Sequence, residues 1–204
     1  MRRLSLLTMK KSAPTNSSGG PPAKKNHWSG GLLASMQDPE LKVLEDDDVI
    51  VIKDKYPKAK FHYLVMPKKD IPALKHVTKE NIDLLEHMEK VGENLTKEHK
   101  DHDFIVGYHA VPSMQRLHLH VISTDFNSPC LKTKQHWNSF TTPFFIPSRN
   151  VRIQLEKDGR IKLNTEANNK YLLENLKCHK CSKLPKNMPE LKRHLLEHLP
   201  SEEK

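Results

Sequence analysis

The sequence predicts an α+β fold in which an antiparallel sheet is backed by one long helix and followed by a small C-terminal metal-binding module. Three features of the chain lead to this expectation. Short runs of apolar and β-branched residues recur through the first part of the chain. One long segment between them carries an apolar stripe of helical period, and two cysteines and two histidines lie close together near the C-terminus.

Four of the apolar runs are expected to form strands. Residues 49–52 and 61–66 have the density of apolar and β-branched side chains that is typical of central strands, and Pro57 lies in the turn between them. Residues 103–108 and 117–123 supply the third and fourth strands. Paired antiparallel, these four segments form the sheet.

The long helix is expected at about residues 78–98. Thr78 suits its N-cap and Glu80 suits its first turn. Four apolar residues then fall near one helical face, namely Ile82, Leu85, Met88 and Leu95. This stripe supplies the face that packs on the sheet.

Three further segments give weaker signals. Residues 36–44 are expected to form a short helix or a turn. Residues 135–145, which are aromatic and rich in Thr and Ser, are expected to be an irregular segment packed beside the functional site. Residues 151–155 and 160–163 alternate in polarity on either side of an Asp-Gly pair, and this pattern predicts a hairpin.

Length, charge and cysteine content narrow the class of protein. A chain of 204 residues holds one domain of ordinary size and a small module. The net charge of +9 and the pI near 9.4 favour a polyanionic partner. No apolar run reaches the length of a membrane span, so no membrane association is expected. The three cysteines are an odd number and two have metal-type spacing, which indicates a reducing compartment.

Residues 1–26 are expected to be a disordered basic arm. They contain six basic residues, no acidic residue, and a middle rich in Ser, Gly and Pro. The arm could tether nucleic acid, direct the chain to the nucleus, act as a mitochondrial presequence, or be a simple solvated tail. Residues 4–7 are too short a hydrophobic run for a secretory signal. A nuclear location is expected, with the mitochondrial alternative left open.

The most specific spacing in the chain is Cys-x2-Cys-x12-His-x3-His, formed by Cys178, Cys181, His194 and His198. Two thiolates from a tight knuckle and two imidazoles one turn apart on a helix can close a tetrahedral Zn²⁺ site. We therefore expect a zinc finger at residues 177–199 with one structural zinc ion. The alternative is a cysteine pair that happens to lie near an amphipathic helix.

A single finger of this kind reads only about three base pairs, too few for a sequence-specific regulator. Basic residues surround the predicted finger, namely Lys177, Lys180, Lys183, Lys186, Lys192 and Arg193. Their positive charge favours non-specific contact with a phosphate backbone.

The stretch that carries the chemistry is residues 107–123. From Leu117 onward the residues alternate as in a strand, so that Leu117, Leu119 and Val121 share one face. His118 and His120 share the other face, about 7 Å apart, which is close enough for two imidazoles to act on one group. A polar outer face of the sheet is the alternative.

This stretch resembles the histidine triad family of nucleotide hydrolases and transferases, whose motif alternates three histidines with apolar residues. Within that family, Gly-Tyr-His-Ala-Val-Pro-Ser-Met ahead of Leu-His-Leu-His is similar to members that act on adenylated DNA. The same similarity is seen in residues 36–39, 51–60 and 128–132 and at the pair His136-Trp137. It covers residues 27–198, and within residues 148–176 it favours a helix over the hairpin.

Two departures from the family pattern stand out. The first triad position is Arg116, and the phosphopeptide-binding domain found at the N-terminus of the vertebrate members is missing from the sequence. A guanidinium is always charged and cannot accept a proton, although it can bind a phosphate or an acidic neighbour. Because Arg116 comes two residues before His118, its side chain is expected to point to the same face.

The resemblance implies roles for individual residues. His118 would attack the α-phosphate and form a covalent His118–AMP intermediate. His120 would hold the phosphate oxygens, and His109 would stabilise the transition state or assist the leaving group. Nucleotide or phosphate contacts are implied for Asp54, at the ribose, and for Lys58, Ser113, Arg116, Lys132 and His136. His62 is expected to be structural.

The implied function is a DNA repair hydrolase. Its substrate would be DNA with 5′-adenylated ends, which abortive ligation leaves at nicks or breaks. The products would be AMP and 5′-phosphate DNA, and the hydrolysis would need no cofactor. The implied organisation is a hydrolase domain at residues 27–147, a connecting segment at 148–176 that packs on it, and then the finger. The alternatives are a hydrolase of small nucleotides, such as nucleoside phosphoramidates or dinucleoside polyphosphates, and a non-catalytic zinc-finger DNA-binding protein.

Overall fold

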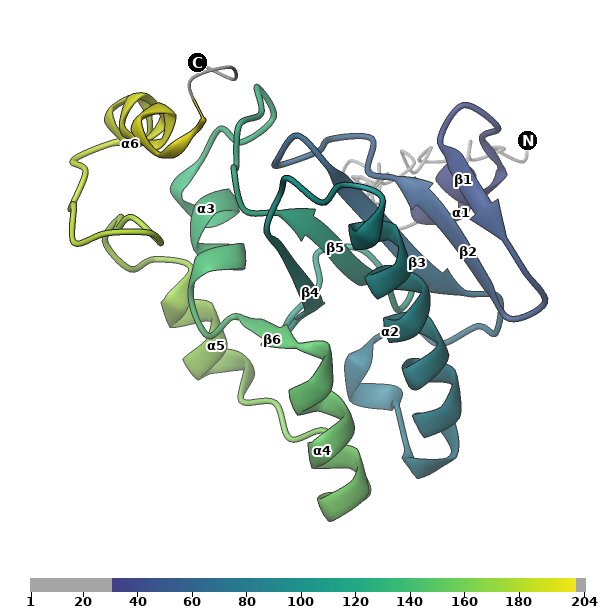
Figure 1. Cartoon of the computed structure of the whole chain (residues 1–204). Coiled ribbons are helices and arrows are strands. Elements are labelled where there is room, and N and C mark those ends of the chain that lie inside the picture. Colours follow the sequence, from purple (N-terminus) through teal and green to yellow (C-terminus); the bar gives the residue numbers. More distant parts are fainter. Residues whose placement is uncertain (1–30, 201–204) are drawn as a thin grey trace, which may run out of the picture.

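The computed structural model describes residues 31–200, so the predicted basic arm lies outside the described residues. Within this range the strands form one antiparallel sheet with the order β1-β2-β3-β5-β4-β6 (Figure 1). The strands are β1 (Lys42–Glu45), β2 (Val49–Lys53), β3 (His62–Pro67), β4 (Phe104–His109), β5 (Leu119–Ser123) and β6 (Phe145–Pro147). The predicted α+β fold and its four central strands are confirmed.

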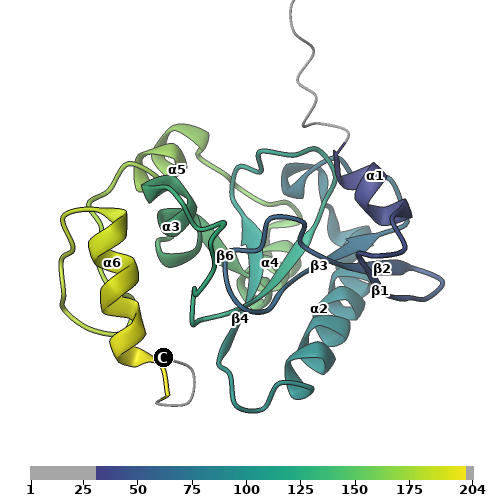
Figure 2. The ribbon, with the colours of Figure 1, turned by 90° about the horizontal axis from the view of Figure 1, so that it is seen from above.

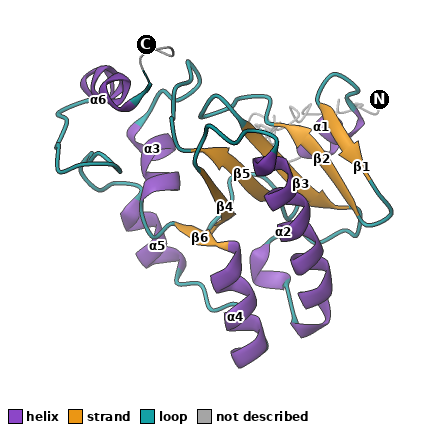
Figure 3. Cartoon of the chain, viewed as in Figure 1, coloured by secondary structure: helices purple, strands orange, loops and turns teal. Residues whose placement is uncertain are grey.

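Helices cover both faces of the sheet (Figure 3). The α-helices are α1 (Gly31–Gln37), α2 (Ile82–Lys97), α3 (Lys134–Thr141), α4 (Ser148–Asp158), α5 (Thr165–Tyr171) and α6 (Met188–Leu195). Short 3₁₀ turns lie at Leu74–His76, Lys79–Asn81 and Leu196–His198. None of the helices in the described part of the chain is long and apolar enough to cross a membrane.

The long helix α2 covers one face of the sheet, as predicted. Its residues Leu85, Met88 and Leu95 belong to the same buried core as the inward-facing residues of the strands, which include Val51, Val65, Leu119 and Val121. Gly92 allows the close approach, because a Cβ there would lie 2.9 Å from the Val121 side chain. At the start of the helix, the Thr78 amide donates to Asn81 Oδ1 at 3.0 Å.

The opposite face is covered at its two ends and left open between them. Helix α1 covers one end with Leu32, and α3 covers the other with Trp137 and Phe140. Figure 2 shows both helices on one side of the sheet and α2 on the other. The outward-facing histidines of β3, β4 and β5 lie between α1 and α3, so the site is formed in this gap.

One sequence-based expectation is wrong, and a second segment, for which two alternatives were left open, is a helix. Residues 135–145 are not irregular but contain α3, whose N-cap Thr133 accepts from the His136 amide at 3.1 Å. For residues 151–163 the polarity pattern predicted a hairpin and the family resemblance predicted a helix; the structure has a helix, α4, which ends at Gly159 in the left-handed conformation with φ 74°. Val151 and Leu155 are four residues apart and both buried, so the apolar positions that suggested a strand also fit one helical face.

The C-terminal residues pack directly on the domain that contains the sheet. Leu176, Leu191 and Leu195 share a buried cluster with Trp137 and Phe126. The Trp137 indole N–H also donates to the Lys177 carbonyl at 3.0 Å. We call residues 177–199 the terminal module; it is continuous with the core of the domain.

A stability prediction follows from the pairing of β4 with β6. A Cβ at Gly107 would overlap the Ile146 carbonyl and lie 2.7 Å from a ring carbon of Phe145. We expect Gly107→Ala to destabilise the fold by about 1–3 kcal/mol, since neither backbone can move without breaking the pairing. Urea unfolding measures this, with Gly31→Ala as the control because a Cβ there meets nothing within 4 Å. Equal midpoints for the two variants would contradict the prediction.

Candidate active site

A cavity of about 880 Å³ opens on the histidine-bearing face of the sheet. It is framed by the ends of β2 and β4, the start of β3, the loop before β5, and α3. Eight of the residues predicted for the site line it, namely Asp54, Lys58, His109, Ser113, His118, His120, Lys132 and His136. The structure thus brings together residues from five separate parts of the chain.

His118 is held in one tautomer by the backbone. Its Nδ1 lies 2.7 Å from the Arg116 carbonyl oxygen. Because a carbonyl only accepts, Nδ1 must carry the proton and Nε2 keeps its lone pair. Burial lowers the pKa of His118, while the hydrogen bond to Arg116 and the charge of Asp54 oppose that shift. At neutral pH the ring is therefore uncharged, with a lone pair on Nε2.

His120 is oriented by a neighbour that the sequence analysis treated as structural. His62 Nε2 lies 2.9 Å from His120 Nδ1, and the Lys58 amide donates to His62 Nδ1 at 3.2 Å. An amide can only donate, so His62 carries its proton on Nε2 and gives that hydrogen bond to His120. His120 then carries its own proton on Nε2, an atom that is buried and has no hydrogen-bond partner in the described structure. It is a donor available to a phosphate oxygen.

Burial keeps these rings neutral. It lowers the pKa of His62 to about 4, and it lowers the pKa values of His109 and His120 well below the usual value, with the neighbouring histidines adding to the shift. The ring centroids of His118 and His120 are 4.8 Å apart and those of His109 and His120 are 4.3 Å apart. The predicted catalytic histidines therefore form one cluster, packed against Phe140.

Cationic and polar groups lie around the cluster. Lys58 is half-buried, and burial lowers its pKa while Asp54 opposes the shift. Two contacts tie the loop that carries Lys58 to the loop that carries Lys132. Ser128 Oγ donates to the Pro57 carbonyl at 2.5 Å, and the Lys60 amide donates to Asp125 Oδ1 at 3.0 Å. The two lysines are thereby held on the same side of the cavity.

The prediction for Arg116 is wrong: its side chain does not point into the cavity. It is buried against the loop that follows β3, where Nη2 donates to the carbonyls of Pro67 and Lys68. The period-2 argument fails because β5 begins only at Leu119 and Arg116 has a left-handed φ of 93°. A contact between this side chain and a phosphate in the cavity is excluded in this arrangement.

The contact of His62 with His120 could not be predicted from the sequence. The contact comes from β3–β5 pairing, which sets Leu64 opposite His120 and places the two imidazoles on the same face. A histidine at the start of a strand gives no sign of this partner in the sequence. The available signal was that His62, like His120, occupies an outward-facing position of a central strand.

The predicted zinc ligands meet at one point of the terminal module. All four ligand atoms of Cys178, Cys181, His194 and His198 lie within 4.8 Å of one another. His194 Nε2 lies 3.1 Å from Cys181 Sγ and 3.1 Å from His198 Nε2. A tetrahedral zinc site needs roughly 3.4–3.6 Å between such atoms, so small adjustments suffice. Glu197 accepts from His194 Nδ1 at 3.0 Å and fixes the ring with Nε2 inward.

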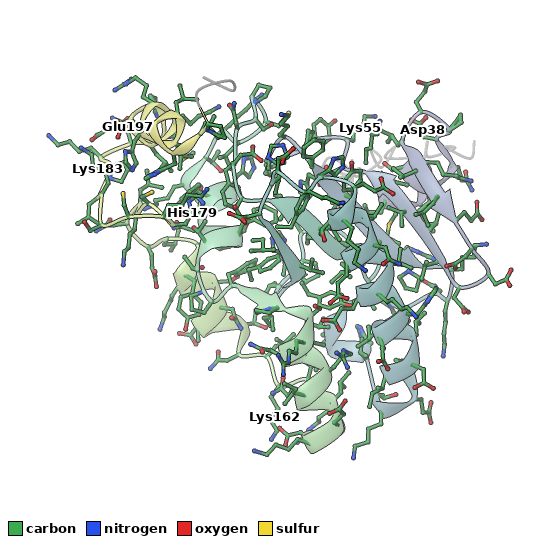
Figure 4. All side chains as sticks on the ribbon, viewed as in Figure 1. Asp38, Lys55, Lys162, His179, Lys183 and Glu197 are labelled. Carbon is green, nitrogen blue, oxygen red and sulfur yellow. The ribbon has the colours of Figure 1, made fainter. Side chains whose placement is uncertain are left out.

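The knuckle of the module also contacts the domain. His179, between the two cysteines, donates from Nε2 to the Thr124 carbonyl at 2.8 Å. Its ring packs edge-on against Phe126 and Trp137. In Figure 4 His179 lies where the module meets the domain, while Lys183 and Glu197 lie farther out. The metal site and the domain core are thus in direct contact.

The fold and these two sites define a histidine triad protein with a C-terminal zinc finger. Family models agree: "Scavenger mRNA decapping enzyme C-term binding" matches residues 27–136, and "C2HE / C2H2 / C2HC zinc-binding finger" matches residues 141–201. The chain is 51% identical to aprataxin of Danio rerio, over 86% of this chain and 55% of that protein. It is 30% identical to the aprataxin-like protein of Schizosaccharomyces pombe, over 85% of this chain and 82% of that protein. The chain belongs to the aprataxin family.

A solved structure supports the same assignment. The aprataxin ortholog Hnt3 in complex with DNA matches with a TM-score of 0.67 and 29% identity, covering 83% of this chain and 94% of that chain. The chain spans about half the length of the animal aprataxins that it matches.

Proposed function

We propose that this protein is a DNA repair hydrolase that removes AMP from 5′-adenylated DNA ends through a covalent His118–AMP intermediate. The observation that carries the proposal is the tautomer of His118. Its proton lies on Nδ1, facing the Arg116 carbonyl, so the Nε2 lone pair is free within a cavity that also presents the His120 donor and two lysines. Such a combination suits attack on a phosphate.

The proposed reaction has two successive displacement steps at the same phosphorus. In the first, Nε2 of His118 attacks the phosphorus of the adenylate, an N–P bond forms, and the bridging P–O bond breaks. The electron pair leaves on the 5′-phosphate of the DNA. In the second, water attacks the same phosphorus and the N–P bond breaks, which gives AMP, releases a proton and restores the ring. The Arg116 carbonyl favours the first step because the Nδ1–H bond strengthens as the ring becomes positive.

Several charged groups suit a DNA substrate. Lys58 and Lys132 line the cavity, and the terminal module presents exposed basic residues at its surface, namely Lys177, Lys180, Lys183, Lys186 and Arg193. With one structural zinc ion in place, the module would hold the duplex by its phosphates while the strand end enters the cavity. The similarity to a protein solved in complex with DNA supports this proposal.

The test is product analysis on a 5′-adenylated nicked duplex, run beside a small adenylate such as a dinucleoside polyphosphate. We expect AMP and a ligatable 5′-phosphate strand from the duplex. Raising the salt from about 50 to 200 mM should weaken the apparent affinity for the duplex by 10³-fold or more if six or more phosphates are contacted, and leave the small substrate largely unaffected. Hydrolysis of only the small adenylate would favour a small-nucleotide hydrolase instead.

A further inference from the structure

Arg116 has a backbone conformation that L-residues rarely adopt. Its φ of 93° lies in the left-handed region, where the backbone of a residue other than glycine is strained. Such a conformation persists only where the surroundings hold it. Two backbone hydrogen bonds do so here: the Arg116 amide donates to the Pro72 carbonyl at 2.8 Å, and the Leu117 amide donates to the Ile71 carbonyl at 2.7 Å.

The side chain supplies a second anchor on the same loop. Arg116 Nη2 lies 2.9 Å from the Pro67 carbonyl oxygen and 2.8 Å from that of Lys68. An ion pair with Asp70 at 3.4 Å adds little, since the Asp70 side chain is 84% exposed. The two carbonyl bonds, of which the bond to Pro67 is buried and the bond to Lys68 is partly buried, are therefore the main attachment of the guanidinium.

These anchors fix the direction of one carbonyl group. The Arg116 carbonyl accepts from His118 Nδ1 at 2.7 Å, and this is the contact that leaves Nε2 unprotonated. Rotation of the peptide that follows Arg116 would turn the oxygen away from the ring. The ring could then take the other tautomer, with its proton on the atom that must attack.

We infer that Arg116 is a positioning residue, whose side chain, anchored on the carbonyls of Pro67 and Lys68, sets its own carbonyl and thereby the tautomer and orientation of His118. The guanidinium touches no part of the cavity, so its effect on the reaction passes entirely through the backbone. This inference rests on the proposed role of His118 as nucleophile.

The test compares Arg116→Ala, Arg116→Lys and Asp70→Ala in the full chain. We expect Arg116→Ala to lower kcat for AMP release by about 10–100-fold with little change in KM, because misplacing a reacting group by about 1 Å costs on that order. Arg116→Lys, which keeps one donor near the carbonyls, should recover part of the loss. Asp70→Ala should behave as the parent chain, and so should Arg149→Ala, an exposed control on α4.

A second measurement needs no substrate. The ¹⁵N shifts of the His118 ring, assigned with His118→Gln, report which nitrogen carries the proton. We expect Nδ1–H in the parent chain and a mixture of tautomers in Arg116→Ala, or in Arg116→Lys if the alanine variant does not fold. An unchanged kcat in folded Arg116→Ala, an effect on KM alone, or Nε2–H in the parent chain would overturn the inference. If the parent chain released no AMP, the proposed function would fail, whereas the tautomer measurement would still decide this point.

Discussion

Replacing His118 with alanine is expected to lower kcat for AMP release by at least about a thousandfold, since the variant loses the atom that forms the covalent bond. Two of its neighbours lack a free nitrogen that could substitute for it. His120 carries its proton on Nε2, and both nitrogens of His62 are occupied by the Lys58 amide and His120. DNA affinity should change little, because the lysines and the terminal module are untouched.

The measurement is rapid-quench trapping of the protein–AMP adduct on a radiolabelled 5′-adenylated nick. The parent chain should give an acid-labile adduct that is absent from His118→Ala. His76→Ala serves as the matched control, since His76 is an exposed histidine away from the cavity. An adduct of normal yield in His118→Ala would assign the nucleophile to another residue. If the parent chain formed no adduct and released no AMP, a non-catalytic DNA-binding protein would be the better description.

The parts of the fold that could be predicted are those in which local pattern and burial agree. Strands β2, β3, β4 and β5 are apolar and β-branched, and α2 has a clear stripe, so packing confirmed what the periodicity indicated. Strand β1 gave no such signal, because three of its four residues are exposed and it lies at the edge of the sheet. Helix α3 was missed because its aromatic and Thr-rich composition has weak helix propensity, and packing of Trp137 and Phe140 stabilises it instead.

The candidate active site, like the fold, could be predicted from the sequence only in part. Motif and resemblance identified His109, His118 and His120, since the chemistry and spacing of these residues are local properties of the sequence. They could not give the direction of Arg116, which depends on a left-handed φ and on carbonyls of residues almost fifty positions earlier in the chain. They also could not give the partnership of His62 with His120, which exists only because β3 pairs with β5.

Removal of zinc is expected to unfold the terminal module and abolish stable DNA binding. Structural zinc contributes about 10–16 kcal/mol in isolated fingers, and such modules do not fold without it. Here the loss extends further, because the module buries Trp137, which is 1% exposed, and His179 bonds to Thr124. Chelation should therefore expose the aromatic side of α3.

Tryptophan fluorescence emission measures this exposure of α3. The chain has two tryptophans, and Trp28→Phe leaves Trp137 as the only reporter. In that background a strong chelator, or Cys181→Ser, should shift the emission to longer wavelength and weaken DNA binding at least tenfold. Cys130→Ser is the matched control for metal content: it should retain one zinc ion per chain, because Cys130 lies outside the Cys178, Cys181, His194 and His198 cluster. If zinc-free protein kept a buried Trp137 and its DNA affinity, the docked leucines alone would be sufficient to hold the module.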